Sequence, residues 1–253
     1  MDSKEVTSQY DSRVTAANAA AREQKYKDVS VGETAGGFQV LIDGRPAYTP
    51  ERRPLESSRR ALMDAIAQEW RAQIAAINPA AMPLTRLLAT QLDRVAPQRA
   101  AIVAGLVNYI DVDVLCYRAP DPPQLKALQE SEWQPVLDWL EKEFAIALIA
   151  VDGITPARQS QGAAAALAAA LEKLDDAKLT VLQATASLTS SIALSFALVL
   201  GRLNAREVHV ASHLDELFQS EKWGEDPAAK NRRDMIAADL DAVGRYLELS
   251  QVA

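Results

Sequence analysis

Three side chains near the end of the chain have the spacing of a metal site. His209 and His213, the only two histidines, are four residues apart, and Glu216 follows three residues later. On a helix this spacing puts all three on one face, as in many zinc sites. Val210, however, stands where the HExxH motif has its glutamate, and no cysteine is near in the sequence. We predict no metal and no cofactor, and keep a metal-dependent enzyme using His209 and His213 as an alternative.

Asp111 and Asp113 are a second pair of closely spaced titratable residues. General acid–base catalysis would need both carboxylates to converge on a substrate, whereas residues two apart diverge on a helix. We expect them to cap or brace the domain junction, and Cys116 to be a small buried residue. The glycine pair at 36–37 lacks a GxGxxG context and a Walker lysine, so it predicts a turn. Because no nucleophile lies beside a base, the sequence predicts a protein that is not an enzyme.

Composition and charge narrow the class of protein. The chain has 253 residues, 49% apolar and 24% charged, which is enough for a buried core and predicts two domains. A net charge of −7 argues against nucleic acid and anionic lipid as partners. The N-terminal sequence MDSKEVTSQYDSR lacks the apolar core of a secretory signal and is too acidic for a typical mitochondrial presequence. With a lone cysteine, this predicts a cytoplasmic protein.

The segment from Leu179 to Gly201 carries no charge and is long enough to span a bilayer. Threonine, serine and glutamine interrupt it, and only Ile192 to Leu200 is densely apolar. We therefore predict no membrane insertion and a central buried helix of a helical bundle.

Two sequence periods predict the N-terminal architecture. Apolar residues alternate over 29–31 and 38–42, and Asp43-Gly44 signals a hairpin, which predicts a small antiparallel sheet of about three strands. A helical stripe over 55–77 then predicts a covering helix, capped by Ser57 or Ser58 and ended by prolines 79 and 83. Trp70 lies in this stripe, so we expect it to pack the helix on the sheet; a client-contacting anchor is the other interpretation.

The rest of the chain is predicted to be mainly helical. Helical spacing of apolar residues predicts helices over 84–95, 100–111, 125–144, 160–175, 178–203, 205–222 and 228–249. Residues 13–25 could form another helix, 111–118 a helix end or an extended piece, and 146–151 a short strand. The predicted fold class is α+β, predominantly α, with an N-terminal α/β domain over residues 1–96 and a C-terminal multi-helical bundle over 97–253.

Six short pieces occur in a fixed order: GGFQVLIDGRPAYTP, AQEWRAQ, MPLTRL, NYIDVDVLCYR, EWQPVLDWLEKEF and FQSEKWGED. Together they resemble the assembly chaperones of the ATP synthase α subunit, the "ATP-twelve" family, over about residues 26–249. No single piece is decisive, but the ordered set is far more specific than one motif. The family is mitochondrial in eukaryotes, in the matrix, and also occurs in alphaproteobacteria; a chain without a presequence resembles the bacterial type.

The resemblance implies a function and a set of residues. It implies binding of the unassembled ATP synthase α subunit, which prevents aggregation before assembly with β, by a protein we expect to be monomeric. It also implies that the helix before the K-W-G element binds the client, with Glu216 as the clearest candidate. A structural adaptor of another complex remains a further alternative. The client-binding candidates are Asp215, Glu216, Glu221 and Trp223, and the structural family-motif residues are Trp70, Pro83, Leu84, Asp111 and Asp113.

Overall fold

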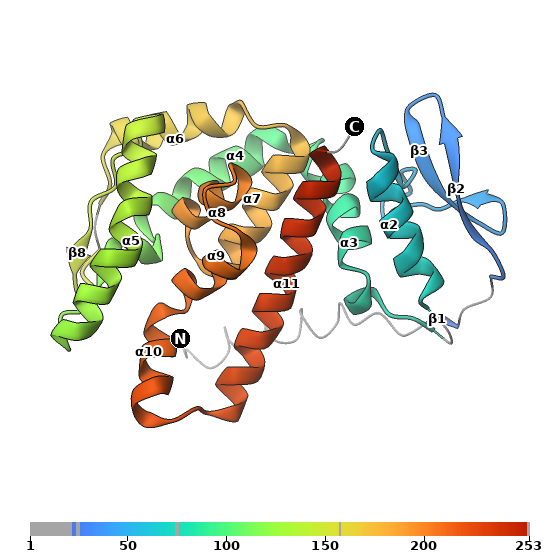
Figure 1. Ribbon diagram of the computed structural model, residues 1–253. Helices are drawn as coiled ribbons and strands as arrows, with labels where there is room; N and C mark the ends of the chain where they lie inside the picture. Colours follow the sequence, from blue (N-terminus) through green and yellow to red (C-terminus); the bar gives the residue numbers. More distant parts are fainter. Residues whose placement is uncertain (1–21, 24–25, 74–75, 157, 252–253) are drawn as a thin grey trace, which may run out of the picture.

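A small antiparallel sheet lies at one end of the molecule and helices form most of the rest (Figure 1). The computed structural model describes residues 22–23, 26–73, 76–156 and 158–251. Residues 22–23 form strand β1 (Arg22–Glu23), so the helix predicted over 13–25 is wrong at these two positions, and the rest of that range lies outside the described residues. The predicted class, α+β and predominantly α, is confirmed.

The main sheet is a hairpin with two short additions. Strands β2 (Val29–Thr34) and β3 (Gly37–Ile42) pair with Val31 opposite Val40. Strands β4 (Arg45–Pro46) and β5 (Glu56–Ser57) both pair with β3, so the sheet has one strand more than predicted. Gly37 must be glycine, because its φ is +136° and a Cβ would lie 2.5 Å from the Ser57 carbonyl oxygen. The predicted turn is present one residue earlier, at 35–36, and Gly37 begins β3.

Helix α2 (Arg60–Arg71) covers this sheet and buries Leu62 and Ile66 against it. It is shorter than the predicted 55–77, because the Gln73 side chain closes the turn after it: Gln73 donates to the Glu69 carbonyl at 3.0 Å and accepts from Asn78 N at 2.8 Å. Residues 76–77 then form β6 (Ala76–Ile77), which pairs with β1.

Both predicted helix signals next to α2 are wrong. The N-cap is Arg59, with no side-chain cap bond, and Ser57 Oγ instead accepts from the Arg59 amide. Pro79 and Pro83 do not end α2; they begin the 3-10 helix η1 (Pro79–Ala81) and helix α3 (Pro83–Thr90), because a proline lacks only an amide that the first turn leaves unpaired.

The remaining elements follow largely as predicted. Strands β7 (Tyr117–Arg118) and β8 (Val151–Asp152) pair in parallel. An extended piece was expected within 111–118 and another within 146–151, and both strands lie at the C-terminal ends of these ranges. The elements after α3 are the π-helix η2 (Gln91–Val95), α4 (Arg99–Val107), η3 (Asn108–Asp111), η4 (Val114–Cys116), β7 (Tyr117–Arg118), α5 (Pro123–Phe144), β8 (Val151–Asp152), α6 (Gln161–Glu172), α7 (Asp176–Thr189), α8 (Ile192–Val199), α9 (Ala205–Ser212), α10 (Leu214–Trp223) and α11 (Pro227–Gln251).

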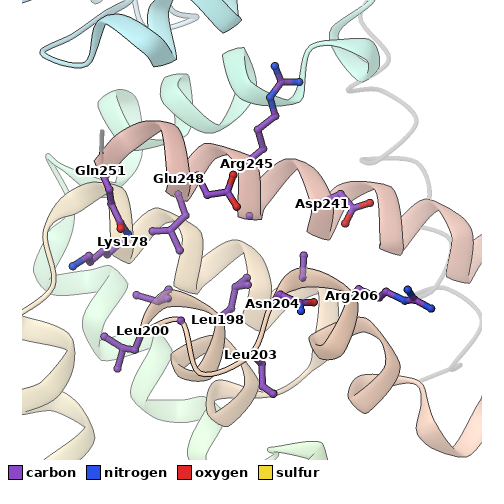
Figure 2. Close-up of a pocket in the computed structure, with 15 residues that line it drawn as sticks. Lys178, Leu198, Leu200, Leu203, Asn204, Arg206, Asp241, Arg245, Glu248 and Gln251 are labelled. Atoms are coloured by element: carbon purple, nitrogen blue, oxygen red, sulfur yellow. The ribbon is translucent and has the colours of Figure 1, made fainter. Parts of the chain in front are cut away.

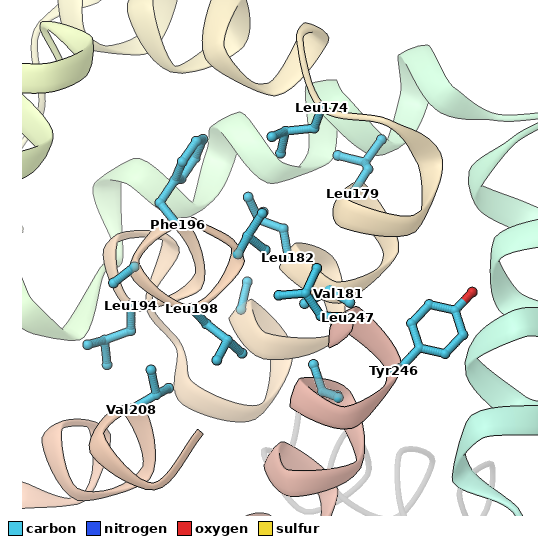
Figure 3. Close-up of a cluster of buried hydrophobic side chains, with 14 of the residues drawn as sticks. Leu174, Leu179, Val181, Leu182, Leu194, Phe196, Leu198, Val208, Tyr246 and Leu247 are labelled. Atoms are coloured by element: carbon cyan, nitrogen blue, oxygen red, sulfur yellow. The ribbon is translucent and has the colours of Figure 1, made fainter. Parts of the chain in front are cut away.

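The helices predicted over 178–203 and 205–222 are each two helices. The first breaks at Ser190, whose φ is +53°, and Ser191 caps the new helix α8. The second breaks at His213. Every residue of α8 is buried, and Figure 3 shows Phe196 and its neighbours packed among the other helices. The segment predicted as one central buried helix is thus largely buried but forms two helices. No helix in the described ranges has the length and apolar character needed to cross a membrane.

Helix α11 links the two parts of the fold. It packs against α7 and α9 and also reaches α3 and α2 (Figure 1). Tyr246 on α11 is fully buried and donates its hydroxyl to the side chain of Gln91 in η2. The division into domains 1–96 and 97–253 stays a prediction. If the chain is divided in this way, α11 belongs to the second domain and packs on α2 and α3 of the first.

Candidate functional site

The four client-binding candidates lie on α10, which runs antiparallel to the first half of α11. This helical hairpin projects from one side of the molecule (Figure 1). The turn between the two helices contains Gly224, whose φ of +92° suits glycine. The hairpin therefore presents the candidates on an ordered element, but the individual side chains differ in what they contact.

Glu216 holds α10 against α11. Its carboxylate accepts hydrogen bonds at 3.2 Å from Arg232 Nη2 and from Arg233 Nη1. Arg233 is only 3% exposed, and its other terminal nitrogen donates to Glu225 Oε1 at 2.8 Å. Burial opposes ionisation of Glu216, but the hydrogen bonds from the two arginines outweigh it and hold its pKa below the usual value. The buried Arg233 guanidinium thus bridges Glu216 on α10 and Glu225 in the turn between α10 and α11.

Asp215 is held by the neighbouring helix. Its Oδ1 accepts from Gln129 Nε2 at 2.7 Å, and Gln129, which is fully buried in α5, also accepts from the Ala119 amide at 2.7 Å. Trp133, one turn further along α5, donates its indole N–H to the Ala211 carbonyl at 2.9 Å. Asp215 therefore positions α10 on α5.

Trp223 and Glu221 face the solvent at the far end of α10. Trp223 is 70% exposed, and Glu221 is exposed too. The Lys222 ammonium lies 5.5 Å from the Trp223 ring centroid and 5.8 Å from that of Phe218. Such exposed cation–π contacts are weak and leave most of the indole accessible. Of the four candidates, these two are the most exposed.

The histidine pair contacts the same hairpin. The rings of His209 and His213 lie 4.6 Å apart, as the helical spacing predicted. His209 Nε2 is 3.0 Å from the Arg233 carbonyl oxygen, and His213 Nδ1 is 3.0 Å from the His209 carbonyl oxygen. Burial lowers the pKa of His213, which favours the neutral ring. The Glu216 carboxylate binds Arg232 and Arg233 instead of facing the histidines. No group of three potential ligands that could hold a metal occurs in the described part of the chain.

Asp113 and Asp111 diverge, as expected. Asp113 is fully buried, and its carboxylate accepts from the Leu115 amide at 3.0 Å, the Ser191 hydroxyl at 2.9 Å and the Ala193 amide at 2.9 Å. It thus caps η4 and braces the start of α8, inside the helical part rather than at the predicted domain junction. Asp111 is exposed and accepts from the Gln159 amide at 2.9 Å.

Cys116 is buried, as predicted, and burial raises the pKa of its thiol to about 12. A thiol with so high a pKa is a poor nucleophile at neutral pH. Cys116 therefore behaves as a small core residue.

The N-terminal motif residues form a structural junction. Trp70 is half-buried, its ring centroid lies 6.2 Å from that of Tyr26, and its carbonyl accepts from the Tyr26 hydroxyl at 2.7 Å. This supports the packing interpretation over the client-anchor interpretation. Pro83 is the first residue of α3, and Leu84 is buried.

Glu69 is the member of this junction that sequence reasoning missed. Its carboxylate accepts from the Leu84 amide at 2.7 Å, the Thr85 amide at 2.8 Å and the Thr85 hydroxyl at 2.7 Å. It therefore caps α3 from α2 and joins the two sequence pieces AQEWRAQ and MPLTRL. Nothing in the spacing marks this pair, because the cap comes from another helix. Gln129 and Arg233 were missed for the same reason.

Replacing Glu69 with alanine should lower the free energy of unfolding by about 2–3 kcal/mol, since three donors at the start of α3 lose a charged acceptor. Glu69→Gln keeps one acceptor oxygen and should lose less. Urea unfolding of both variants measures this, and equal stability of Glu69→Ala and the unmodified chain would refute the cap.

A separate hollow of about 820 Å³ lies between the α8–α9 loop and the last turns of α11 (Figure 2). Apolar Leu198 and Leu203 lie on one wall and charged Asp241 and Glu248 on the other. At Gly244 on α11, an added Cβ would lie 3.4 Å from that of Ala205 on α9, close to ordinary van der Waals contact. The lining mixes both signs of charge and does not identify a ligand.

Comparisons with known proteins agree with the fold and the motifs. A family model described as ATP12 chaperone protein matches residues 23–141. The protein Atp12 from Paracoccus denitrificans has a crystal structure that superposes with a TM-score of 0.84 at 36% identity, over 91% of this chain and 99% of that one. A protein from Agrobacterium tumefaciens superposes with a TM-score of 0.83 at 38% identity, over 89% of this chain and 85% of that one.

A more distant relative is the mitochondrial protein atp12 of Schizosaccharomyces pombe. It is 21% identical over 211 residues, which are 79% of this chain and 72% of the relative. The crystallised Paracoccus protein, by contrast, is matched over nearly its whole length at an identity that implies common descent. The chain belongs to the ATP12 chaperone family.

Proposed function

We propose that this chain is an assembly chaperone of ATP synthase, which binds the unassembled α subunit and keeps it from aggregating until it assembles with β. The observation that carries the proposal is family membership over nearly the whole chain, including both the sheet and the C-terminal helices. The proposal includes a cytoplasmic site of action and a monomeric chaperone without a catalytic role.

Such a chaperone must bind its client tightly enough to protect it, yet be displaced when the true partner arrives. A subunit awaiting assembly exposes a large apolar interface, which is an aggregation hazard. Its holder must cover that interface and then give way to the true partner, which favours a moderately polar, displaceable contact over a permanent one.

We place part of the client contact at the end of α10. Trp223 offers a large exposed apolar surface, and Glu221 supplies a charge beside it. Tryptophan is enriched among residues that dominate binding energy. Asp215 and Glu216 act indirectly, since their carboxylates are engaged by Gln129, Arg232 and Arg233 and thereby hold α10 in place.

Trp223→Ala should weaken binding of the α subunit by roughly tenfold to a hundredfold, the range of a hot-spot residue. The melting temperature should not change, because the side chain is largely exposed. Met235→Ala is a matched control, since Met235 is 63% exposed on α11. Titration of labelled α subunit measures the affinity of both variants. An equal loss of affinity in Trp223→Ala and Met235→Ala would contradict a specific role of Trp223.

The proposed function is tested by aggregation. Purified α subunit is diluted from denaturant, and light scattering is followed with increasing amounts of the chain. Suppression should saturate near one chaperone per α subunit, and an unrelated acidic protein should have no effect. Scattering that stays unchanged at a twofold excess of the chain would refute the proposal.

A further inference from the structure

The connector between α5 and α6 exposes large apolar side chains far from α10 in the sequence. Ile154 is 94% exposed and Ile149 is 55% exposed, and Val112, after η3, is 59% exposed. Gln159 links Ile149 to Asp111, the residue before Val112, since it bonds both the Ile149 backbone and the Asp111 carboxylate. Val112, Ile149 and Ile154 are named the connector surface below.

The connector backbone is extended and held in place. Burial alternates along it: Ile146 is fully buried, Ala147 is exposed, Leu148 is partly buried and Ile149 is exposed. This is the alternation of a strand with one face on the core. Strand β8 pairs with β7, and the Gly153 amide donates to the Arg118 carbonyl at 2.8 Å, so Ile154 projects from a fixed position.

One edge of this extended segment is already occupied. The Ile149 amide donates to Gln159 Oε1 at 2.7 Å, and the Ile149 carbonyl accepts from Gln159 Nε2 at 3.0 Å. The side-chain amide of Gln159 thus pairs with Ile149 as a neighbouring strand would. It occupies the edge that β7 occupies two residues later, at Val151. Alternate residues of a strand direct their backbone groups to opposite edges. Leu148 therefore faces the other edge, where it makes no backbone hydrogen bond to another described residue.

Charge restricts the kind of partner. Residues 145–156 contain a single charged side chain, Asp152, and Lys126 Nζ neutralises it at 2.8 Å. A neutral stretch on a protein of net charge −7 complements an uncharged apolar segment rather than an acidic or basic one.

We infer that the connector surface binds an extended apolar segment of the unassembled client subunit, which adds as a strand along the edge of Leu148 and packs on Ile149 and Ile154. Strand addition draws affinity from backbone hydrogen bonds and selects its partner through alternate side chains. This inference rests on the proposed function and adds a second contact to that of Trp223.

The test compares two double variants of the full chain. Ile149→Asp/Ile154→Asp places charges on the connector surface, and Tyr48→Asp/Leu200→Asp places the same charges on exposed apolar residues elsewhere. With purified α subunit as the probe, the first pair should raise the dissociation constant at least tenfold, while the second should leave it unchanged. Both should keep the melting temperature of the unmodified chain, because all four side chains are exposed.

Hydrogen–deuterium exchange supplies a readout of the backbone. In the complex, the amides of residues 147–150 should exchange more slowly than in the free chain. Unchanged affinity of Ile149→Asp/Ile154→Asp, with no added protection there, would overturn this inference alone. If the unmodified chain does not bind α at all, the proposed function fails and this inference fails with it. Protection that appears in the chaperone alone as its concentration rises would identify a second copy as the occupant and overturn the inference too.

Discussion

Asp113→Ala should lower the free energy of unfolding by about 3 kcal/mol, because two buried amides and one buried hydroxyl lose their acceptor. Burial raises the pKa of Asp113 in spite of these bonds, so the cost of desolvating the carboxylate offsets part of their gain. For a chain of this length the loss corresponds to a fall of roughly 6–12 °C in melting temperature. Thermal unfolding followed by circular dichroism measures it.

Two variants make this result specific. Asp113→Asn keeps one acceptor oxygen, but its amide NH2 group faces at least one of the three groups that donate to Asp113. Its loss of stability should therefore lie between those of the unmodified chain and Asp113→Ala. Asp111→Ala removes a carboxylate two residues away that is exposed, and should cost less than about 1 kcal/mol. Equal effects of Asp111→Ala and Asp113→Ala would show that Asp113 does not brace α8.

Glu216→Lys should lower the free energy of unfolding by about 2–3 kcal/mol and weaken client binding. The substitution places a cation beside Arg233, which is 3% exposed, and removes one of its two carboxylate partners. Breaking a fully buried pair costs about 3–5 kcal/mol; the half-exposed Glu216 and the remaining Glu225 reduce the effect. Urea unfolding and titration of α subunit measure the two effects.

Glu221→Lys is the matched control for stability, since it makes the same change of charge on the same helix at an exposed residue. Its free energy of unfolding should stay within about 0.5 kcal/mol of the unmodified chain. A double-mutant cycle of Glu216→Gln and Arg233→Met should give a coupling energy of roughly 1–3 kcal/mol. Independent effects in that cycle would mean that Glu216 does not act through Arg233.

The pH dependence of this contact has a definite sign. Because the folded-state pKa of Glu216 is lowered, its contribution to stability is present above its unfolded-state pKa, about 4.3, and is lost as the pH falls through the folded value. Glu216→Gln should therefore reduce the acid-induced loss of stability without changing the slope of stability with pH above pH 6.

Periodicity predicted most of the fold. Alternation placed β2 and β3 correctly, and helical spacing placed α5 and α11 within two residues at each end. These features depend on residues near in sequence, whose pattern records which face is buried.

The breaks and caps could not be predicted, because long-range contacts set them. The sequence carries no charge on either side of Ser190, so one helix was predicted there, yet Asp113, 78 residues from Ser191, pairs with that serine and fixes where α8 starts. Likewise, Gln73 closes α2 early and Glu69 caps α3. Local propensity yields to such tertiary contacts.

The candidate site divides in the same way. The predicted helix over 205–222 contains Asp215, Glu216 and Glu221, with Trp223 directly after it, and the structure has all four on α10. The sequence could not distinguish the engaged carboxylates from the exposed indole, because Gln129 and Arg233 come from other helices. The connector surface was missed because the apolar run at 146–151 predicts a short strand but does not show which of its side chains face the solvent.

The central claim is that the chain holds the α subunit and then releases it to β. Size-exclusion chromatography with light scattering measures this directly, first on a mixture of the chain with purified α subunit and then after addition of β. The account predicts a complex of one chain with one α subunit, which β converts into an α–β assembly with free chaperone. Separate elution of the chain and α before β is added, or a complex that β cannot dissociate, would contradict it.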